Sequence, residues 1–159
     1  MKVRVVDIEP ARVAFLRHTG PFGPALGDFW RDVVDPWIRE NGLAGRVTYG
    51  VAIDDPSTTP PEKCRYDACV EIGHDDPAPA PAALATITGG RYAVVDFYGP
   101  PSGIGEAWYA FYAKALPAAG LKDRPGPPFE RYAADFRTDP QTGAFSCELF
   151  IPIDEKEDL

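Results

Sequence analysis

Residues 12–21 read RVAFLRHTGP, and residues 91–100 read RYAVVDFYGP. Each stretch begins with arginine, continues with mostly apolar residues in the manner of a buried strand, and ends at Gly-Pro. Because glycine and proline interrupt regular structure, both stretches are expected to be strands that stop at the same point. They indicate an internal repeat, with an offset of 79 residues between Arg12 and Arg91.

The repeat extends beyond these strands. Further matches at or near this offset follow in the same order along both halves: Tyr66 with Phe145, Ile72 with Ile151 and, with a small drift, Tyr49 with Tyr132. We predict a single domain, residues 1–159, built from two modules of one architecture, residues 1–78 and 79–159. Each module alone is too small to bury its sheet well, so the two should pack with pseudo-two-fold symmetry. A cleft between them would be a natural ligand site.

Each module is predicted to read strand, helix, strand, strand, so the chain should be an α+β protein with antiparallel sheets and two long helices. Alternating apolar residues mark the strands. The predicted strands are 3–8, 12–19, 47–54 and 65–72 in the first half, and 84–88, 91–98, 129–137 and 145–153 in the second.

Two segments, 24–40 and 103–118, are predicted helices because their apolar residues recur at three- and four-residue spacings. Pro36 lies inside the first pattern and is expected to kink that helix or to end it early. Gly89-Gly90 separates two predicted strands and is a signal for a hairpin turn.

Composition and charge exclude several classes of protein. The net charge of −8 and the pI of about 4.7 argue against direct nucleic-acid binding, which needs a basic surface. No apolar stretch approaches the ~20 residues of a membrane helix, and the first residues lack the apolar run of a signal peptide, so we expect a cytoplasmic protein without membrane contacts. The three cysteines are expected to be buried or half-buried reduced thiols: Cys64, Cys69 and Cys147. With only two histidines in the chain, we expect neither a metal site nor a cofactor.

Glu130 is the first candidate site residue. By the two-residue period of a strand it shares a face with Tyr132 and Phe136, which is an unusual setting for an acid. A buried carboxylate is costly unless it is paired. Glu130 therefore either pairs with Arg124 or Arg131, or serves a ligand or a reaction. The pattern alone leaves both interpretations open.

Aromatic residues provide the remaining candidates. Plain core packing is the alternative for each of them. Flat apolar walls with a few hydroxyls suit a planar ligand, and a cationic ligand would also gain cation–π contacts. If the repeat places its tyrosines symmetrically on inner strands, they would surround the cleft. The candidate ligand contacts are Tyr49, Tyr66, Tyr132 and Phe145 on strands, with Trp108 and Tyr112 on the second helix.

Blocks along nearly the whole chain resemble those of GyrI-like proteins, a domain that also forms the effector-binding part of several AraC-type and multidrug-responsive transcription activators. The blocks are His18-Thr19-Gly20-Pro21-Phe22, Tyr49-Gly50, Asp54-Asp55-Pro56, Cys64-Arg65-Tyr66-Asp67, Gly89-Gly90-Arg91-Tyr92-Ala93, Phe129-Glu130-Arg131-Tyr132 and Ile151-Pro152-Ile153. The resemblance implies two fused modules with a central ligand cleft. It also implies that Glu130 faces the ligand, as the matching acid does toward cationic planar compounds in multidrug-responsive relatives. The implied aromatic walls are Tyr49, Tyr66, Tyr132 and Phe145, and Phe145 lacks a hydroxyl sometimes found at its position.

Three functions are left open. Since no basic helix-turn-helix segment precedes Val3, the chain resembles the stand-alone branch of this family. The first hypothesis is a protein that binds or sequesters apolar, planar, possibly cationic molecules. The second is a hydrolase of cyclopropane-type electrophiles, in which Glu130 and Trp108 would serve the reaction. The third is a modulator of DNA gyrase that acts through protein contacts. The first two would use the same pocket.

Overall fold

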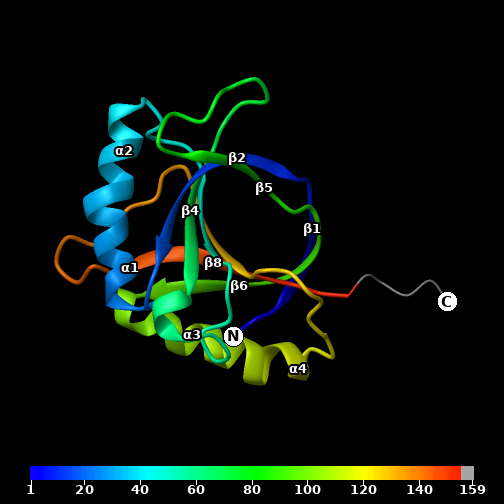
Figure 1. Cartoon of the computed structure of the whole chain (residues 1–159). Coiled ribbons are helices and arrows are strands. Elements are labelled where there is room, and N and C mark those ends of the chain that lie inside the picture. The colour runs from blue at the N-terminus through cyan, green and yellow to red at the C-terminus, as the bar shows by residue number, and fades with distance from the viewer. Residues whose placement is uncertain (155–159) are drawn as a thin grey trace.

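The computed structural model describes residues 1–154, so the end of the second predicted module, residues 155–159, lies outside the described part. Eight strands form one antiparallel sheet in the order β1-β6-β8-β7-β3-β4-β2-β5. The sheet curls strongly, and two helices pack along its outer face (Figure 1). The strands are β1 (Arg4–Ile8), β2 (Ala11–Thr19), β3 (Thr48–Ala52), β4 (Arg65–Glu71), β5 (Ala83–Ile87), β6 (Gly90–Gly99), β7 (Phe129–Tyr132) and β8 (Phe145–Pro152).

The strand order confirms the duplicated α+β fold. The repeat relates β1 to β5, β2 to β6, β3 to β7 and β4 to β8. When these partners are exchanged, the strand order is reversed, as a two-fold axis between β7 and β3 requires. The two predicted sheets are therefore halves of one continuous sheet, joined by the β3–β7 pair. The axis of the repeat passes through the middle of the sheet, where the residues of both halves meet.

The prediction of a hairpin at Gly89-Gly90 is wrong. Strand β5 pairs with β2, and β6 pairs with β1, so the first strands of the two halves are exchanged. Figure 1 shows β1 continuing into β2 as one bent ribbon. The connection from β5 to β6 passes this bend: an ideal Cβ on Gly89 would lie 2.8 Å from Pro10 Cδ and 3.0 Å from the Ile8 carbonyl oxygen. Gly89 allows two segments of the chain to cross at a short distance. The glycine signal in the sequence does not distinguish such a crossing from a hairpin turn.

Gly89→Ala is therefore expected to lower the free energy of unfolding by about 1–3 kcal/mol, the usual cost of forcing extra atoms into a packed site. The nearest atoms belong to backbone and to a proline ring, which cannot rotate away. Urea unfolding measures the effect. Gly105→Ala in the second helix is the control, because its added methyl meets nothing within 4 Å. Equal stabilities of the two variants would contradict the close crossing.

Both predicted helices form, and each contains a widened turn. The first runs through α1 (Pro24–Phe29), the π-helical turn η1 (Trp30–Val34) and α2 (Asp35–Glu40). The second runs through the 3-10 turn η3 (Pro101–Gly103), α3 (Ile104–Ala110), the π-helical turn η4 (Phe111–Ala115) and α4 (Leu116–Ala118). A short 3-10 turn, η2 (Pro61–Lys63), precedes β4.

Pro36 does not end the first helix. The backbone N–H of Asp35 reaches back to the carbonyl oxygen of Trp30, five residues earlier, so the wide turn lies immediately before the proline. Proline lacks a donor and its ring crowds the preceding turn, and a π turn relieves both problems. Pro117 follows the wide turn of the second helix in the same way. The repeat therefore preserves this irregularity in both halves.

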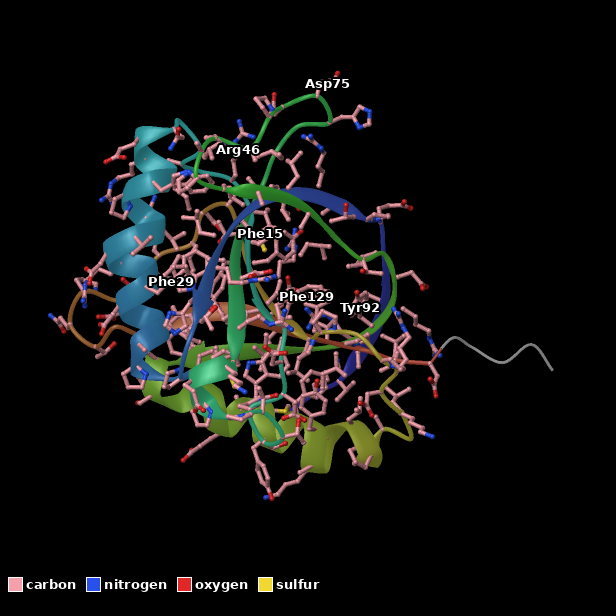
Figure 2. All side chains as sticks on the ribbon, in the orientation of Figure 1. Phe15, Phe29, Arg46, Asp75, Tyr92 and Phe129 are labelled. Carbon is pink, nitrogen blue, oxygen red and sulfur yellow. The ribbon has the colours of Figure 1, made fainter. Side chains whose placement is uncertain are left out.

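The core consists of three clusters. One lies between β6, β8 and the second helix, another between β2, β4 and the first helix, and the third lies inside the curve of the sheet. In the third cluster the ring centroids of Tyr92 and Phe129 are 5.3 Å apart, and Figure 2 shows both side chains within the curve. All three cysteines are buried free thiols, as predicted. Among residues 1–154, no helix combines the length and hydrophobicity needed to cross a membrane.

Candidate functional site

The candidate site lies at the centre of the sheet, on the face covered by the helices. Gly50 of β3 is directly opposite Glu130 of β7, in the strand pair that joins the two halves. The same register places Tyr132 opposite Thr48, so Glu130 and Tyr132 share this face. The prediction that these two side chains lie on one face is confirmed. Strand β7 ends at Tyr132, because the chain turns there with the Phe136 N–H donating to the Ala133 carbonyl.

The carboxylate of Glu130 accepts hydrogen bonds from three side chains. The Tyr132 hydroxyl donates to Oε1 at 2.8 Å, and the Tyr66 hydroxyl donates to the same oxygen at 3.2 Å. The indole Nε1 of Trp108 donates to Oε2 at 3.1 Å. The donors come from β7, β4 and α3, so both halves of the molecule hold one acid.

A second tryptophan extends this cluster into the first helix. Trp30 Nε1 donates to the Tyr66 hydroxyl at 3.0 Å. Its ring also meets Tyr132 edge to face, at 5.9 Å between centroids. Trp30 begins the wide turn of the first helix, and Trp108 stands one turn before that of the second. The carboxylate is thus linked to the irregular part of each helix.

Burial controls the electrostatics of this cluster. Glu130 is partly buried, and the side chains of Tyr66, Tyr132 and Trp108 lie against its carboxylate. This desolvation raises the pKa of Glu130 above its ordinary value, although the hydrogen bonds from Tyr132, Trp108 and Tyr66 oppose the rise. Burial, together with the nearby carboxylate, also raises the pKa of Tyr66 and of Tyr132 well above the usual tyrosine value. Both tyrosines therefore remain neutral donors at physiological pH.

The carboxylate has no cationic partner among residues 1–154. The pairing of Glu130 with Arg124 or Arg131, which the sequence left open, does not occur. Arg131 projects from the opposite face and donates to Glu148 at 3.1 Å, and Arg124 donates to the Ile153 carbonyl at 2.8 Å. The other buried acid, Asp67, is bound by Arg17 at 2.7 and 3.0 Å. Glu130 is therefore bound by neutral donors alone among the described residues.

Tyr49 lies away from the other candidates. It neighbours Thr48, so it projects from the opposite face of the sheet to Tyr132. There it lies in the cluster inside the curve and donates a short hydrogen bond to Glu71. The expectation that repeat-related tyrosines surround one cleft does not hold for Tyr49, because the register pairs Tyr132 with Thr48 and a one-residue slip reverses the face.

Phe145 and Tyr112 pack against side chains that bind Glu130 and do not themselves bind its carboxylate. Phe145 is buried, and its ring centroid is 6.0 Å from that of Tyr132. Tyr112 stacks on Trp108 at 6.1 Å and is 37% exposed. These two side chains support Tyr132 and Trp108, whereas Tyr66, Tyr132 and Trp108 touch the carboxylate itself.

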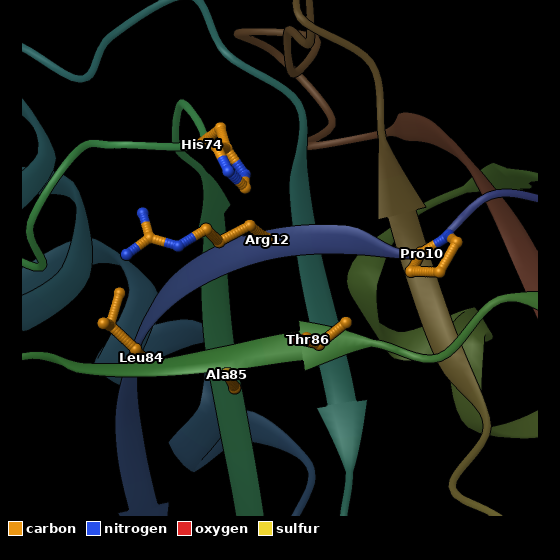
Figure 3. Close-up of a pocket in the computed structure, with 6 residues that line it drawn as sticks. All are labelled: Pro10, Arg12, His74, Leu84, Ala85 and Thr86. Carbon is orange, nitrogen blue, oxygen red and sulfur yellow. The ribbon is translucent and has the colours of Figure 1, made fainter.

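Two surface hollows lie elsewhere. Figure 3 shows the first, at β2 and β5, where Arg12 lies between His74 and the exposed Leu84. The second, of about 450 Å³, lies beneath the loop after β7 and is lined in part by Phe136 and Phe145. Glu130 lines neither hollow.

Sequence reasoning missed two residues of the site. Trp30 is an aromatic residue of the first predicted helix, where core packing is the expected role, and only its hydrogen bond to Tyr66 reveals a polar one. A buried indole N–H needs an acceptor, which is the one signal that could have singled it out. Gly50 has no side chain from which a role could be predicted. Its importance appears only in the structure, where it lies opposite Glu130.

Comparisons with known proteins identify the family of the chain. The family model for the GyrI-like small molecule binding domain matches residues 1–154. The SPbeta prophage-derived protein YosT of Bacillus subtilis is 29% identical over 96% of this chain and 99% of its own length. A DNA gyrase inhibitor of Edwardsiella ictaluri is 30% identical over 96% of this chain and 98% of its own.

The structural comparison extends the likeness to a protein with a bound ligand. The solved structure of SAV2435 bound to tetraphenylphosphonium superposes with a TM-score of 0.68, covering 97% of this chain and 94% of that one. Its sequence identity is 16%, so this likeness shows the fold alone. The family match rests on the sequence model, which spans every residue that the structure describes. The chain belongs to the family of GyrI-like small molecule binding domains.

Proposed function

We propose that this protein binds apolar cationic small molecules, planar ones among them, at Glu130, and so sequesters drugs or toxins. The observation that carries the proposal is a partly buried carboxylate bound only by neutral donors. An ionised group in such a place costs several kcal/mol unless a counter-charge is supplied. Because no side chain among residues 1–154 supplies it, a ligand cation is the natural partner.

The surrounding side chains favour a particular kind of cation. Tyr66, Tyr132 and Trp108 already donate to the carboxylate oxygens. A primary ammonium would need those oxygens for its own hydrogen bonds, whereas a quaternary or phosphonium cation needs only the negative charge. The aromatic faces of Trp30 and Trp108 supply apolar area and cation–π attraction to such a ligand. We therefore expect a preference for cations that carry no hydrogen-bond donors.

Tetraphenylphosphonium is the test ligand, because a protein of the same fold binds it. Tetraphenylborate has the same shape and the opposite charge, and it serves as the matched control. Calorimetry should detect binding of the cation at neutral pH and much weaker binding of the anion. Equal affinities for the two ions would show that shape and apolar surface, and not the charge of Glu130, determine binding.

The affinity for tetraphenylphosphonium should depend on pH. The ligand is a permanent cation, so any pH dependence belongs to the protein. Affinity should be full where Glu130 is ionised and should be lost as the pH falls through the pKa of Glu130. Since burial raises that pKa, the loss should begin above the pH expected for an ordinary glutamate, whose pKa is about 4.3. Calorimetric titrations at a series of pH values measure this loss. An affinity that does not change between pH 7 and pH 4 would contradict the prediction.

Hydrolysis of a strained electrophile is the second candidate, and one contact favours it. Trp108 and Glu130 are hydrogen-bonded partners, and burial raises the pKa of Glu130, which makes its carboxylate a stronger base than an exposed one. Against this, three hydrogen bonds already occupy most of the acceptor sites of the carboxylate, so little of it is left to bind a water or substrate. We therefore place binding ahead of catalysis. None of the described contacts favours a role in modulating DNA gyrase.

A further inference from the structure

Gly50 lies beneath the ring of Tyr66 at the centre of the site. An ideal Cβ on Gly50 would lie 1.8 Å from the Tyr66 hydroxyl oxygen and 2.7 Å from its Cζ. The same atom would lie 2.8 Å from Glu130 Oε1. The hydroxyl therefore occupies the space that any other residue at position 50 would fill with its side chain.

The backbone does not require glycine at this position. Gly50 is in the middle of β3, paired with Ala68 on one side and Glu130 on the other, and it lies outside the left-handed region. Glycine in a strand interior weakens the strand and often marks a close approach of another group. Here that group is the end of the Tyr66 side chain, which crosses over β3 from β4 to reach Glu130 on β7.

We propose that Gly50 is a positioning residue that admits the Tyr66 hydroxyl to Glu130, and thereby connects Trp30 of the first helix to the carboxylate of the second half. The connection runs from Trp30 Nε1 to the Tyr66 hydroxyl and from that hydroxyl to Glu130 Oε1, over 3.0 and 3.2 Å. It is a hydrogen-bonded route from the first helix to the acid, beside the edge-to-face contact of Trp30 with Tyr132. The proposed function enters only in naming Glu130 as the ligand-binding group.

Gly50→Ala should break this connection, and the carboxylate, whose Oε1 would lie 2.8 Å from the added methyl, must also shift slightly. The methyl group would expel the Tyr66 hydroxyl, so Trp30 would lose its acceptor and Glu130 one of its three donors. Tyr132 and Trp108 would remain bound to the carboxylate. Because a donor to a carboxylate favours the ionised form, its loss should raise the pKa of Glu130 further. Tyr66→Phe should have the same electrostatic effect by removing the hydroxyl directly.

Tryptophan indole signals in nitrogen-15 NMR spectra test this without any ligand. The chain has three tryptophans, and Trp→Phe variants assign their signals. In Gly50→Ala the Trp30 signal should move upfield and exchange faster with solvent. Trp37, whose indole nitrogen is buried without a hydrogen-bond partner, should not change. The Trp108 signal reports the titration of Glu130, and its midpoint should rise by about 0.5–1 pH unit in Gly50→Ala and equally in Tyr66→Phe.

Gly27→Ala is the matched control, since this glycine lies in the same helix as Trp30 and an added methyl meets nothing within 4 Å. An unchanged Trp30 signal and an unchanged midpoint in Gly50→Ala would overturn the proposal. So would changes no larger than those in Gly27→Ala.

If Gly50→Ala does not fold, a second pair of variants decides. Tyr66→Ala removes the ring, so adding Gly50→Ala to it should cost little further stability in urea unfolding. A large further loss would mean that Gly50 serves β3 itself and not Tyr66. A protein that fails to bind tetraphenylphosphonium but shows these spectral changes would refute the proposed function and leave the role of Gly50 intact.

Discussion

Glu130→Gln is expected to weaken the binding of tetraphenylphosphonium about 5- to 150-fold, which corresponds to the ~1–3 kcal/mol of a lost charge-assisted contact. The substitution keeps the size of the side chain and removes the one negative charge at the centre of the cluster. Tyr66, Tyr132 and Trp108 would then surround a neutral amide. Calorimetric titration of the wild type and the variant at pH 7 measures the difference.

The matched control is Glu148→Gln. Glu148 lies on the neighbouring strand β8, projects from the opposite face and is paired with Arg4 and Arg131. Its substitution changes the net charge by the same amount, so long-range electrostatics are controlled. Tetraphenylphosphonium affinity should stay within about twofold of the wild type in this variant. A similar loss in both variants would mean that the overall charge, and not Glu130, attracts the cation.

The same substitution separates binding from catalysis. If Glu130 only neutralises a bound cation, neutral planar ligands should bind Glu130→Gln almost as tightly as the wild type. If Glu130 is a general base, a neutral strained electrophile should still bind, but its turnover should fall by about 10²–10⁴-fold. Measured turnover in the wild type that disappears in Glu130→Gln at preserved affinity would overturn the preference for a binding protein.

Phe111→Ala is expected to lower the free energy of unfolding by about 3–5 kcal/mol, the usual cost of truncating a fully buried phenylalanine. Phe111 has 0% exposure and begins the wide turn of the second helix, where it packs against the cluster under β6 and β8. Its ring also stacks on Trp108, at 6.3 Å between centroids. The cavity would therefore open beside a residue that binds Glu130. Urea unfolding at a fixed pH measures the loss.

Tyr109→Ala is the control on the same helix, because Tyr109 is 69% exposed. Its effect on stability should stay within about 0.5 kcal/mol. Since Phe111 supports Trp108, the surviving folded fraction of Phe111→Ala should also bind tetraphenylphosphonium more weakly than Tyr109→Ala does. A stability loss below about 1 kcal/mol in Phe111→Ala would mean that this part of the core refills the cavity, contrary to the packing described.

The sequence by itself determined the features that depend on neighbours along the chain. The period of two within a strand placed Glu130 and Tyr132 on one face, and the period of three to four placed the two helices. The ordered matches between the halves predicted a duplicated α+β fold, which the sheet order confirms. These inferences succeed because each depends on local geometry that every strand or helix shares.

Only the tertiary structure decided how the strands meet. The register between β3 and β7 places Gly50 opposite Glu130, and it turns Tyr49 to the other face, away from its expected partner Tyr132. A shift of one residue between strands reverses every side chain, and an approximate repeat offset does not fix such a shift. The exchange of β1 and β5 is equally invisible in a turn signal, since Gly89 suits both a hairpin and a close crossing. Trp30 joins the site for the same reason, because the acceptor of its indole comes from a strand 36 residues away in the chain.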